Sequence, residues 1–373
     1  MRHKVGRIGV SEAVSAAAVV MCINGLIDIE PNYAYSLGNS TYVSIPASAV
    51  IALALFTSVC AVMKRSGACD LWQLFKLSFG KVGAILPTAL ICVSLLACAS
   101  IPLGNFTHVL DDHVYEGVEY PTLFAFLLPA VVFIAYKGLE VMGRTSKIYS
   151  VILVVSLAVA FVVSLPRQQV YRMYPLMGDG ARHALMFSAS SLACFVPPLS
   201  ALLIFGRGLQ GIGFTKRAGI IASIIAAAVC FAVHFMLSRL YTYKGLTNVF
   251  MPLCRINYQG IERGYIMWLD KLLVMAWLNG AIISAGYCIY ASALLFVKAF
   301  SMDDVTPAVF MMSTVVCALT LLEFICDIER ASILNSFALK YGAVLSVLPL
   351  AVTIPVSILK SRNSIAEDVN GSI

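Results

Sequence analysis

The sequence contains few charged residues, and this scarcity excludes an ordinary soluble domain. Only 12% of its 373 residues are Asp, Glu, Lys or Arg, whereas 60% are hydrophobic. A soluble domain carries about 25% charged residues. The sequence therefore indicates an all-α integral membrane protein whose main partner is the lipid bilayer. The net charge of +7 comes from basic residues scattered through short segments, so we expect no nucleic-acid partner.

The sequence also lacks the patterns that indicate an enzyme or a metal site. It has no CxxC pair, and its 11 cysteines are an odd number, which argues against a disulfide framework and a zinc site. We find no nucleophile–base arrangement and no phosphate-binding loop. The GxGxxG string at Gly206–Gly211 follows an apolar run rather than a strand, so it does not indicate a dinucleotide fold. We expect no enzymatic activity, no cofactor and no bound metal.

Long apolar runs are what the sequence does contain. A hydrocarbon core of about 30 Å requires about 20 apolar residues in a helix. On this measure we expect ten transmembrane helices. The first five are Gly9–Leu37, Tyr42–Met63, Val82–Val109, Pro121–Gly138 and Arg144–Pro166. The second five are Arg182–Phe205, Ala218–Leu240, Gly264–Val297, Val305–Cys326 and Ser336–Leu359. A short interfacial helix is expected at Asp70–Phe79, before the third span.

Lysine and arginine are distributed unevenly between the two sides of this arrangement. With the N-terminus in the cytoplasm, the inner segments carry about twice as many of them as the outer ones, in the direction of the positive-inside rule. The segment Thr107–Tyr120 has four acids and no lysine or arginine, which suits an outer loop. Arg167–Arg182 and Arg239–Arg263 are outer segments that run against the rule. We expect both termini to be cytoplasmic, with residues 360–373 as a cytoplasmic tail.

Two of the expected spans contain residues that interrupt a helix. From Val10 to Ile23 a helix advances only about 21 Å, so Asn24-Gly25 would lie near the midplane. The sixth span contains three serines, Ser188, Ser190 and Ser191, followed by the pair Pro197-Pro198. A proline inside a helix removes a backbone hydrogen bond. Interruptions at corresponding places in two halves indicate a 5+5 inverted-repeat transporter fold with a midplane site. The alternative is that both are ordinary kinks.

This pattern predicts one permease-like domain over residues 1–373, with repeats at about 9–166 and 182–359 and broken helices 1 and 6. The candidate binding residues are those at or near the breaks, together with one acid in the eighth span: Asn24, Gly25, Asp28, Ser190, Ser191 and Asp270. Unwound carbonyls and helix N-termini can bind the two charged ends of an amino-acid-like ligand.

Each of the two acids has a second interpretation. Asp28 could bind the cationic end of a ligand, or it could face the outer vestibule. Asp270 lies between two tryptophans in "GYIMWLDKLLVMAWLNG", and an ionisable residue inside the membrane indicates a functional site by default. It could also lie in the first turns of a long tilted helix and extend toward water. The sequence does not separate these alternatives.

Several blocks of sequence resemble a known family. Together they resemble the B subunits of spore germinant receptors, which are endospore germination permeases of the amino acid–polyamine–organocation superfamily. The blocks, in chain order, are "NGLIDIEP", "FGKVGAILPTALICVSL", "KGLEVMGRTSKIYSVIL", "RMYPLMGDGARHALMFSASS" and "IERGYIMWLDKLLVMAW". They cover most of the chain in the expected order.

The resemblance implies a ten-span fold like that of LeuT-type transporters, in the inner membrane of a spore-forming bacterium. It also implies A and C receptor subunits as partners and a small germinant, such as an amino acid, bound near the two broken helices. Binding would shift a population of conformers and signal to the partner subunits. The residues alone lead only to a small-molecule site in a transporter-like fold.

Two other functions fit the same sequence. The first is an ion-coupled secondary amino acid transporter of the same superfamily. The second is a membrane interaction protein without a ligand, built on a degenerate permease scaffold. A space between the broken helices that is filled by side chains would favour this second function.

Overall fold

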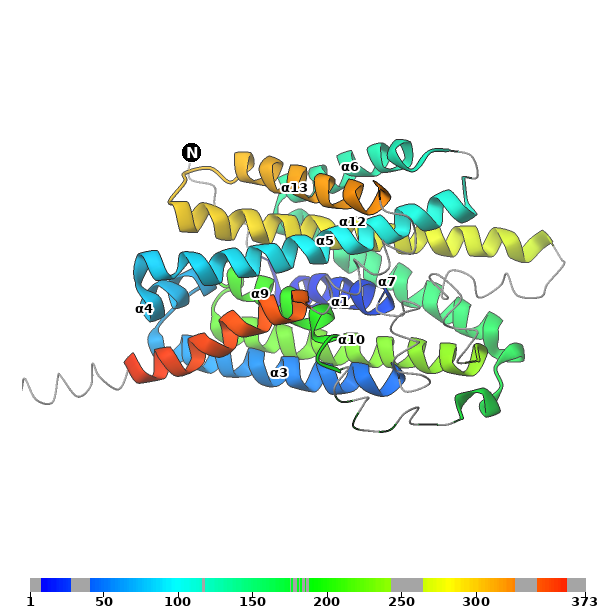
Figure 1. Cartoon of the computed structure of the whole chain (residues 1–373), viewed down its shortest axis with the longest axis horizontal. Helices are drawn as coiled ribbons and strands as arrows, with labels where there is room; N and C mark the ends of the chain where they lie inside the picture. The colour runs from blue at the N-terminus through cyan, green and yellow to red at the C-terminus, as the bar shows by residue number, and fades with distance from the viewer. Residues whose placement is uncertain are drawn as a thin grey trace, which may run out of the picture.

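The computed structural model describes residues 8–27, 41–115, 118–174, 176, 180, 182, 185, 188–242, 264–325 and 341–360. The side chains of residues 41, 112, 113, 264–270, 323 and 324 lie outside this description. Every regular element within the described residues is a helix, and the long helices lie side by side (Figure 1). The prediction of an all-α membrane protein is confirmed.

Seven helices within the described residues are long and apolar enough to cross a membrane. They are Tyr42–Ser66, Ile85–Asp111, Tyr120–Lys137, Leu139–Arg167, Ile212–Leu240, Lys271–Phe300 and Tyr341–Lys360. Three shorter apolar helices, Val10–Leu26, Leu192–Ile204 and Thr306–Leu322, overlap the expected first, sixth and ninth spans. The count of ten membrane crossings therefore stays a prediction.

The short helix expected before the third span is present as α4 (Leu71–Gly83). Asp70 caps its N-terminus, because the carboxylate Oδ1 accepts a hydrogen bond from the backbone N–H of Gln73 at 2.9 Å. The helix buries Leu71, Trp72, Leu74 and Phe75 on one side. It therefore connects α3 to α5 as a packed element rather than as a loop.

The helices form two packing groups that run along each other (Figure 1). The first packing group consists of α1 (Val10–Ile27), α3 (Thr41–Ser66), α9 (Leu192–Ile204) and α10 (Ile212–Leu240). The second packing group consists of α5 (Ile85–His113), α6 (Tyr120–Lys137), α12 (Gly264–Phe300) and α13 (Thr306–Ile325). Helix α7 (Leu139–Ser164) packs against both α1 and α12. Within this arrangement α1 and α9 contact α5 and α12, so they lie at the boundary between the groups.

Gly280 marks the tightest crossing at this boundary. A Cβ atom at Gly280 of α12 would lie 2.5 Å from both the Ile23 Cδ1 on α1 and the Tyr149 hydroxyl oxygen on α7. That hydroxyl donates a hydrogen bond to the Ala276 carbonyl at 2.9 Å, so it is not free to move aside. The small residue thus lets three helices meet.

We expect the variant Gly280→Ala to lower the free energy of unfolding by about 1–3 kcal/mol, since the added methyl group overpacks the crossing. Thermal unfolding of the purified protein in detergent measures this loss. Gly213→Ala on α10 is the control, because no atom lies within 4 Å of the added Cβ and alanine favours the helix. Equal melting temperatures for the two variants would contradict the close packing of the three helices at Gly280.

Candidate functional site

The predicted break at Asn24-Gly25 is wrong. Helix α1 continues through Asn24 and Gly25 and is described as far as Ile27. The physical reason is that the Asn24 amide group folds back along the helix, where Nδ2 donates to the Val20 carbonyl at 2.8 Å. A polar residue whose hydrogen bonds are satisfied inside the protein needs no break in the backbone.

The predicted interruption of the sixth span is correct at one end and wrong at the other. Ala189–Ser191 form a turn, and α9 begins directly after it at Leu192. The Pro197-Pro198 pair lies inside α9, which continues to Ile204. Membrane helices tolerate prolines where neighbouring groups in the protein compensate for the lost hydrogen bonds, and every residue of α9 is buried. The interruption therefore lies at the serines and not at the prolines.

Asn24 connects three helices at the boundary between the packing groups. Its side chain is buried, and Nδ2 also donates to the Ser284 hydroxyl oxygen on α12 at 3.3 Å. The Cys98 thiol on α5 donates to Asn24 Oδ1, with 3.4 Å between sulfur and oxygen. Ser284 and Cys98 were not predicted, because nothing in the sequence indicates which distant residues reach Asn24.

The Gly25 carbonyl lies at the end of α1 and contacts a histidine of α10. His234 is buried, and its Nε2 lies 3.0 Å from the Gly25 oxygen. A Cβ at Gly25 would lie 2.6 Å from the Cys230 sulfur, so a larger residue at this position would require the Cys230 side chain to move. Sequence reasoning missed His234, although an ionisable residue inside an apolar span is a functional candidate by default.

Ser191 stands at the N-terminus of α9 with its hydroxyl unsatisfied. The residue is fully buried, and its Oγ has no hydrogen-bond partner within the described part of the chain. Ser190 is also buried, and its carbonyl accepts a hydrogen bond from the Ala193 N–H at 3.1 Å. The N-terminus of a helix carries a partial positive charge and free backbone N–H groups, which favour an anionic group.

A small cavity lies where α1, α5 and α9 meet. Its lining includes Asn24, Ser94, Cys98, Ala193 and Pro197. It has about 10 Å³ of space for the centre of a water molecule, which is room for about one water. The structure thus brings Asn24 and the first turn of α9 to one space, and side chains fill nearly all of it.

The two predicted acids are not among the described residues that line this cavity. Asp28 lies outside the described residues. Asp270 lies near the start of α12, whose 37 residues extend over about 55 Å, well beyond a hydrocarbon core of about 30 Å. The numbering separates Asp270 from Ser284 by 14 residues, or about 21 Å along the helix axis. The backbone therefore keeps Asp270 well away from Ser284 and Asn24.

The helix arrangement is that of a membrane transporter, as solved structures show. The chain resembles the Na⁺-coupled sialic acid symporter in its substrate-bound outward-open state, with a TM-score of 0.67 and 12% identity over 92% of this chain and 79% of that chain. It also resembles Mhp1, a nucleobase-cation-symport-1 family transporter with bromovinylhydantoin bound, with a TM-score of 0.60 and 10% identity over 97% and 94% of the two chains. These identities establish a shared fold and nothing further.

A third likeness is to the manganese transporter of Eremococcus coleocola, with a TM-score of 0.54 and 11% identity over 94% of this chain and 78% of that chain. No curated protein matches the sequence. Residues 25–327 match the family described as spore germination protein, and this match covers most of the chain. The chain therefore belongs to the spore permease family of spore germination proteins, which is a transporter-like family and not a family of enzymes.

Proposed function

We propose that the chain is the membrane subunit of a nutrient germinant receptor and binds a small germinant, such as an amino acid, between α1 and α9. The observation that carries this proposal is the buried N-terminus of α9. There the Ser191 hydroxyl has no partner within the described residues, in the same turn as the Ala193 that lines the central cavity. Membership of the spore germination family supports a role in germination.

The chemistry of this place suits a ligand with a carboxylate and an ammonium group. The first N–H groups of α9 and the hydroxyls of Ser190 and Ser191 would bind the carboxylate. Asn24, the Gly25 carbonyl and Asp28 would bind the cationic end. Asp270 has no part in this central site, because of its distance along α12 from Ser284.

Binding at this place requires a change of conformation. The cavity has room for about one water, whereas a small-molecule pocket occupies about 300 Å³ or more. The structure then represents a closed conformer, and a germinant would bind an open conformer in which the two packing groups separate. A ligand that binds one conformer more tightly shifts the population toward it. That shift would be the signal to the A and C subunits in the inner spore membrane.

The proposed architecture is ten spans in two inverted repeats, at about 9–166 and 182–359, with both termini cytoplasmic. Helices overlap all ten expected spans, which supports this proposal. Cysteine labelling checks the orientation. A cysteine introduced near Arg7 should resist a membrane-impermeant maleimide in intact cells, whereas one near Asp112 should react. Labelling near Arg7 from outside would reverse the topology.

Deletion of the gene tests the receptor function directly. Spores that lack the chain should fail to respond to at least one nutrient of a defined panel, and they should still germinate through chemicals that bypass receptors. An unchanged response to every nutrient would contradict the proposal. Genes for A-type and C-type subunits next to this one would support it.

A second candidate function is ion-coupled uptake of an amino acid. The observation that favours it is the likeness of the fold to a Na⁺-coupled symporter. Uptake of the labelled nutrient into proteoliposomes separates the two functions: a transporter accumulates it under a sodium or proton gradient, whereas a receptor binds it without accumulation.

The filled cavity favours a third candidate, a scaffold without a ligand. Ser191, directly before α9, and Ser200, within α9, test it. We expect Ser191→Ala to reduce nutrient sensitivity at least about tenfold, the effect of losing about 1.4 kcal/mol from one hydrogen bond to a charged ligand. Ser200→Ala is the matched control, since the Ser200 hydroxyl donates to the Pro197 carbonyl of its own helix at 2.7 Å. Equal sensitivity of the two variants, at equal protein levels, would remove Ser191 from the site.

A further inference from the structure

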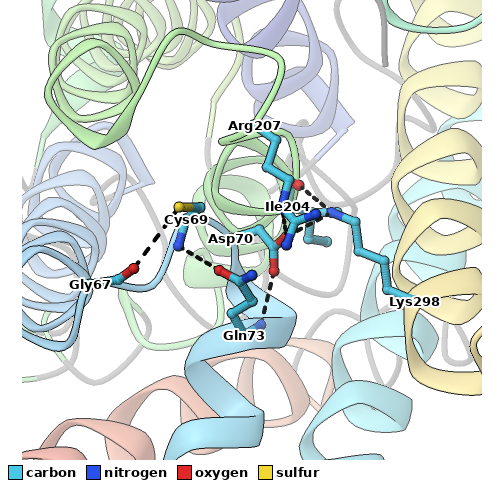
Figure 2. Close-up of polar contacts among 7 residues, drawn as sticks. All are labelled: Gly67, Cys69, Asp70, Gln73, Ile204, Arg207 and Lys298. Atoms are coloured by element: carbon cyan, nitrogen blue, oxygen red, sulfur yellow. Dashed lines mark hydrogen bonds and ion pairs between the residues drawn. The ribbon is translucent and has the colours of Figure 1, made fainter. Parts of the chain in front are cut away.

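Three charged side chains meet at the end of the bundle where α3, α9 and α12 terminate (Figure 2). Asp70 follows α3 and is only 1% exposed. Its Oδ2 lies 2.8 Å from the Arg207 Nε and 3.3 Å from the Lys298 Nζ. One buried carboxylate oxygen is therefore shared by two cations. We call these three residues the Asp70 cluster.

The members of the Asp70 cluster come from both packing groups. Arg207 follows α9 of the first packing group, and Lys298 belongs to the last turn of α12 in the second. The Lys298 ammonium also donates to the carbonyl of Ile204, the last residue of α9, at 3.2 Å. One ammonium group thus contacts the end of α9 directly and the end of α3 through Asp70.

The backbone around Asp70 holds the carboxylate in place. Oδ1 caps α4, and the Gln73 side chain accepts a hydrogen bond from the Cys69 N–H at 2.9 Å. A Cβ at Gly206 would lie 2.6 Å from the Cys69 carbonyl oxygen, so the turn after α9 touches the turn before α4. The N–H of Ile8 donates to the Gly208 carbonyl at 3.3 Å, which adds the start of α1 to the same assembly.

Separating the packing groups at this end would leave charges without partners. Lys298, whose side chain is only 17% exposed, would lose both Asp70 and the Ile204 carbonyl, and removing the partner of a buried charge is strongly destabilising. The Glu140–Arg144 pair differs, because both residues belong to α7 and both side chains are about half-exposed or more. Breaking that exposed pair costs little free energy, and it does not separate the packing groups.

We propose that the Asp70 cluster is an electrostatic latch, which keeps the two packing groups closed at the end where α3, α9 and α12 terminate. This latch rests on the proposed function, because it controls access to the site between α1 and α9. While Lys298 and Arg207 hold Asp70, the site stays closed toward this end. Opening the site toward this end requires Lys298 to leave both Asp70 and the Ile204 carbonyl.

The variant Asp70→Asn isolates the charge. Asparagine has nearly the same shape and still caps a helix, so α4 keeps its N-terminal hydrogen bond while both ion pairs are lost. Cys98 lines the central cavity and is buried, so its reaction with N-ethylmaleimide reports opening of the site. The full-length protein is reconstituted into liposomes without nutrient, and alkylation of Cys98 is followed by mass spectrometry.

We expect the Cys98 alkylation rate to rise at least about tenfold in Asp70→Asn, as a shift of about 1.4 kcal/mol in a two-state equilibrium gives. Glu140→Gln, which breaks the exposed pair on α7, should leave the rate unchanged. A wild-type rate in folded Asp70→Asn would overturn the latch. If Asp70→Asn does not accumulate, Lys298→Met replaces it, because it removes both contacts of the ammonium group with the first packing group, and a wild-type rate there overturns the latch equally.

The measurement separates failure of the latch from failure of the receptor function. Alkylation is recorded without any nutrient, so it responds to opening whether or not a germinant binds. A faster rate together with a normal nutrient panel in deletion spores would support the latch and contradict the germinant site. A lower melting temperature with an unchanged Cys98 rate would show that the cluster only stabilises the fold, and this too overturns the latch.

Discussion

Replacing Asp70 with alanine should lower the free energy of unfolding by about 3–5 kcal/mol, the usual cost of removing one partner from a buried ion pair. The variant loses the α4 cap as well as both ion pairs, and it leaves Lys298, only 17% exposed, without its counter-ion. Thermal or chemical unfolding of the purified protein measures the loss. The control Glu140→Ala removes half of an exposed pair and should cost less than about 1 kcal/mol.

A compensating variant shows whether charge is the cause. In Asp70→Asn with Lys298→Met, the cap remains and the uncompensated ammonium is removed, because neutral groups of similar size often replace a buried pair without loss. This double variant should unfold closer to the wild type than Asp70→Ala does. Equal losses in Asp70→Ala and Glu140→Ala would contradict the buried ion pair.

Replacing Trp277 with alanine should cost about 3–5 kcal/mol, as large-to-small changes in a packed interior do. Trp277 of α12 is 1% exposed, and its Nε1 donates to the Ser156 hydroxyl oxygen on α7 at 3.0 Å. The change removes an aromatic ring from the contact between α7 and α12 and also its hydrogen bond.

The variant Ser156→Ala separates these two contributions. It keeps the ring but leaves the indole N–H buried without an acceptor, which costs about 1–3 kcal/mol. The free energies of unfolding of both variants are measured in the same detergent and compared with the wild type. A loss in Trp277→Ala no larger than that in Ser156→Ala would show that the ring contributes little, contrary to its burial.

The helices could be predicted from the sequence because lipid allows few alternatives. A long apolar run must satisfy its backbone within itself, so it forms a helix, and its length indicates whether it can cross the core. The short helix expected at Asp70–Phe79 was also predictable from the sequence, and the structure adds that Asp70 caps it. The sequence identified Asp70 only as the start of a helix, since Arg207 and Lys298 are far away in the chain.

The candidate site could be predicted only in part, because breaks depend on tertiary partners. Asn24 appeared to interrupt the first span, but Val20, Ser284 and Cys98 satisfy its side chain within a continuous helix. Pro197 and Pro198 appeared to break the sixth span, but α9 is buried along its whole length and continues through them. Ser190 and Ser191 were identified correctly as part of the interruption, because the chain turns at Ala189–Ser191 directly before α9.

Equilibrium binding to the purified chain in nanodiscs tests the central claim, that the region between α1 and α9 holds a small germinant. The ligand is the nutrient whose response disappears in deletion spores. We expect saturable binding to the wild type and to Ser200→Ala, and binding weakened at least about tenfold in Ser191→Ala. No binding to the wild type, or equal binding to all three proteins, would contradict the claim.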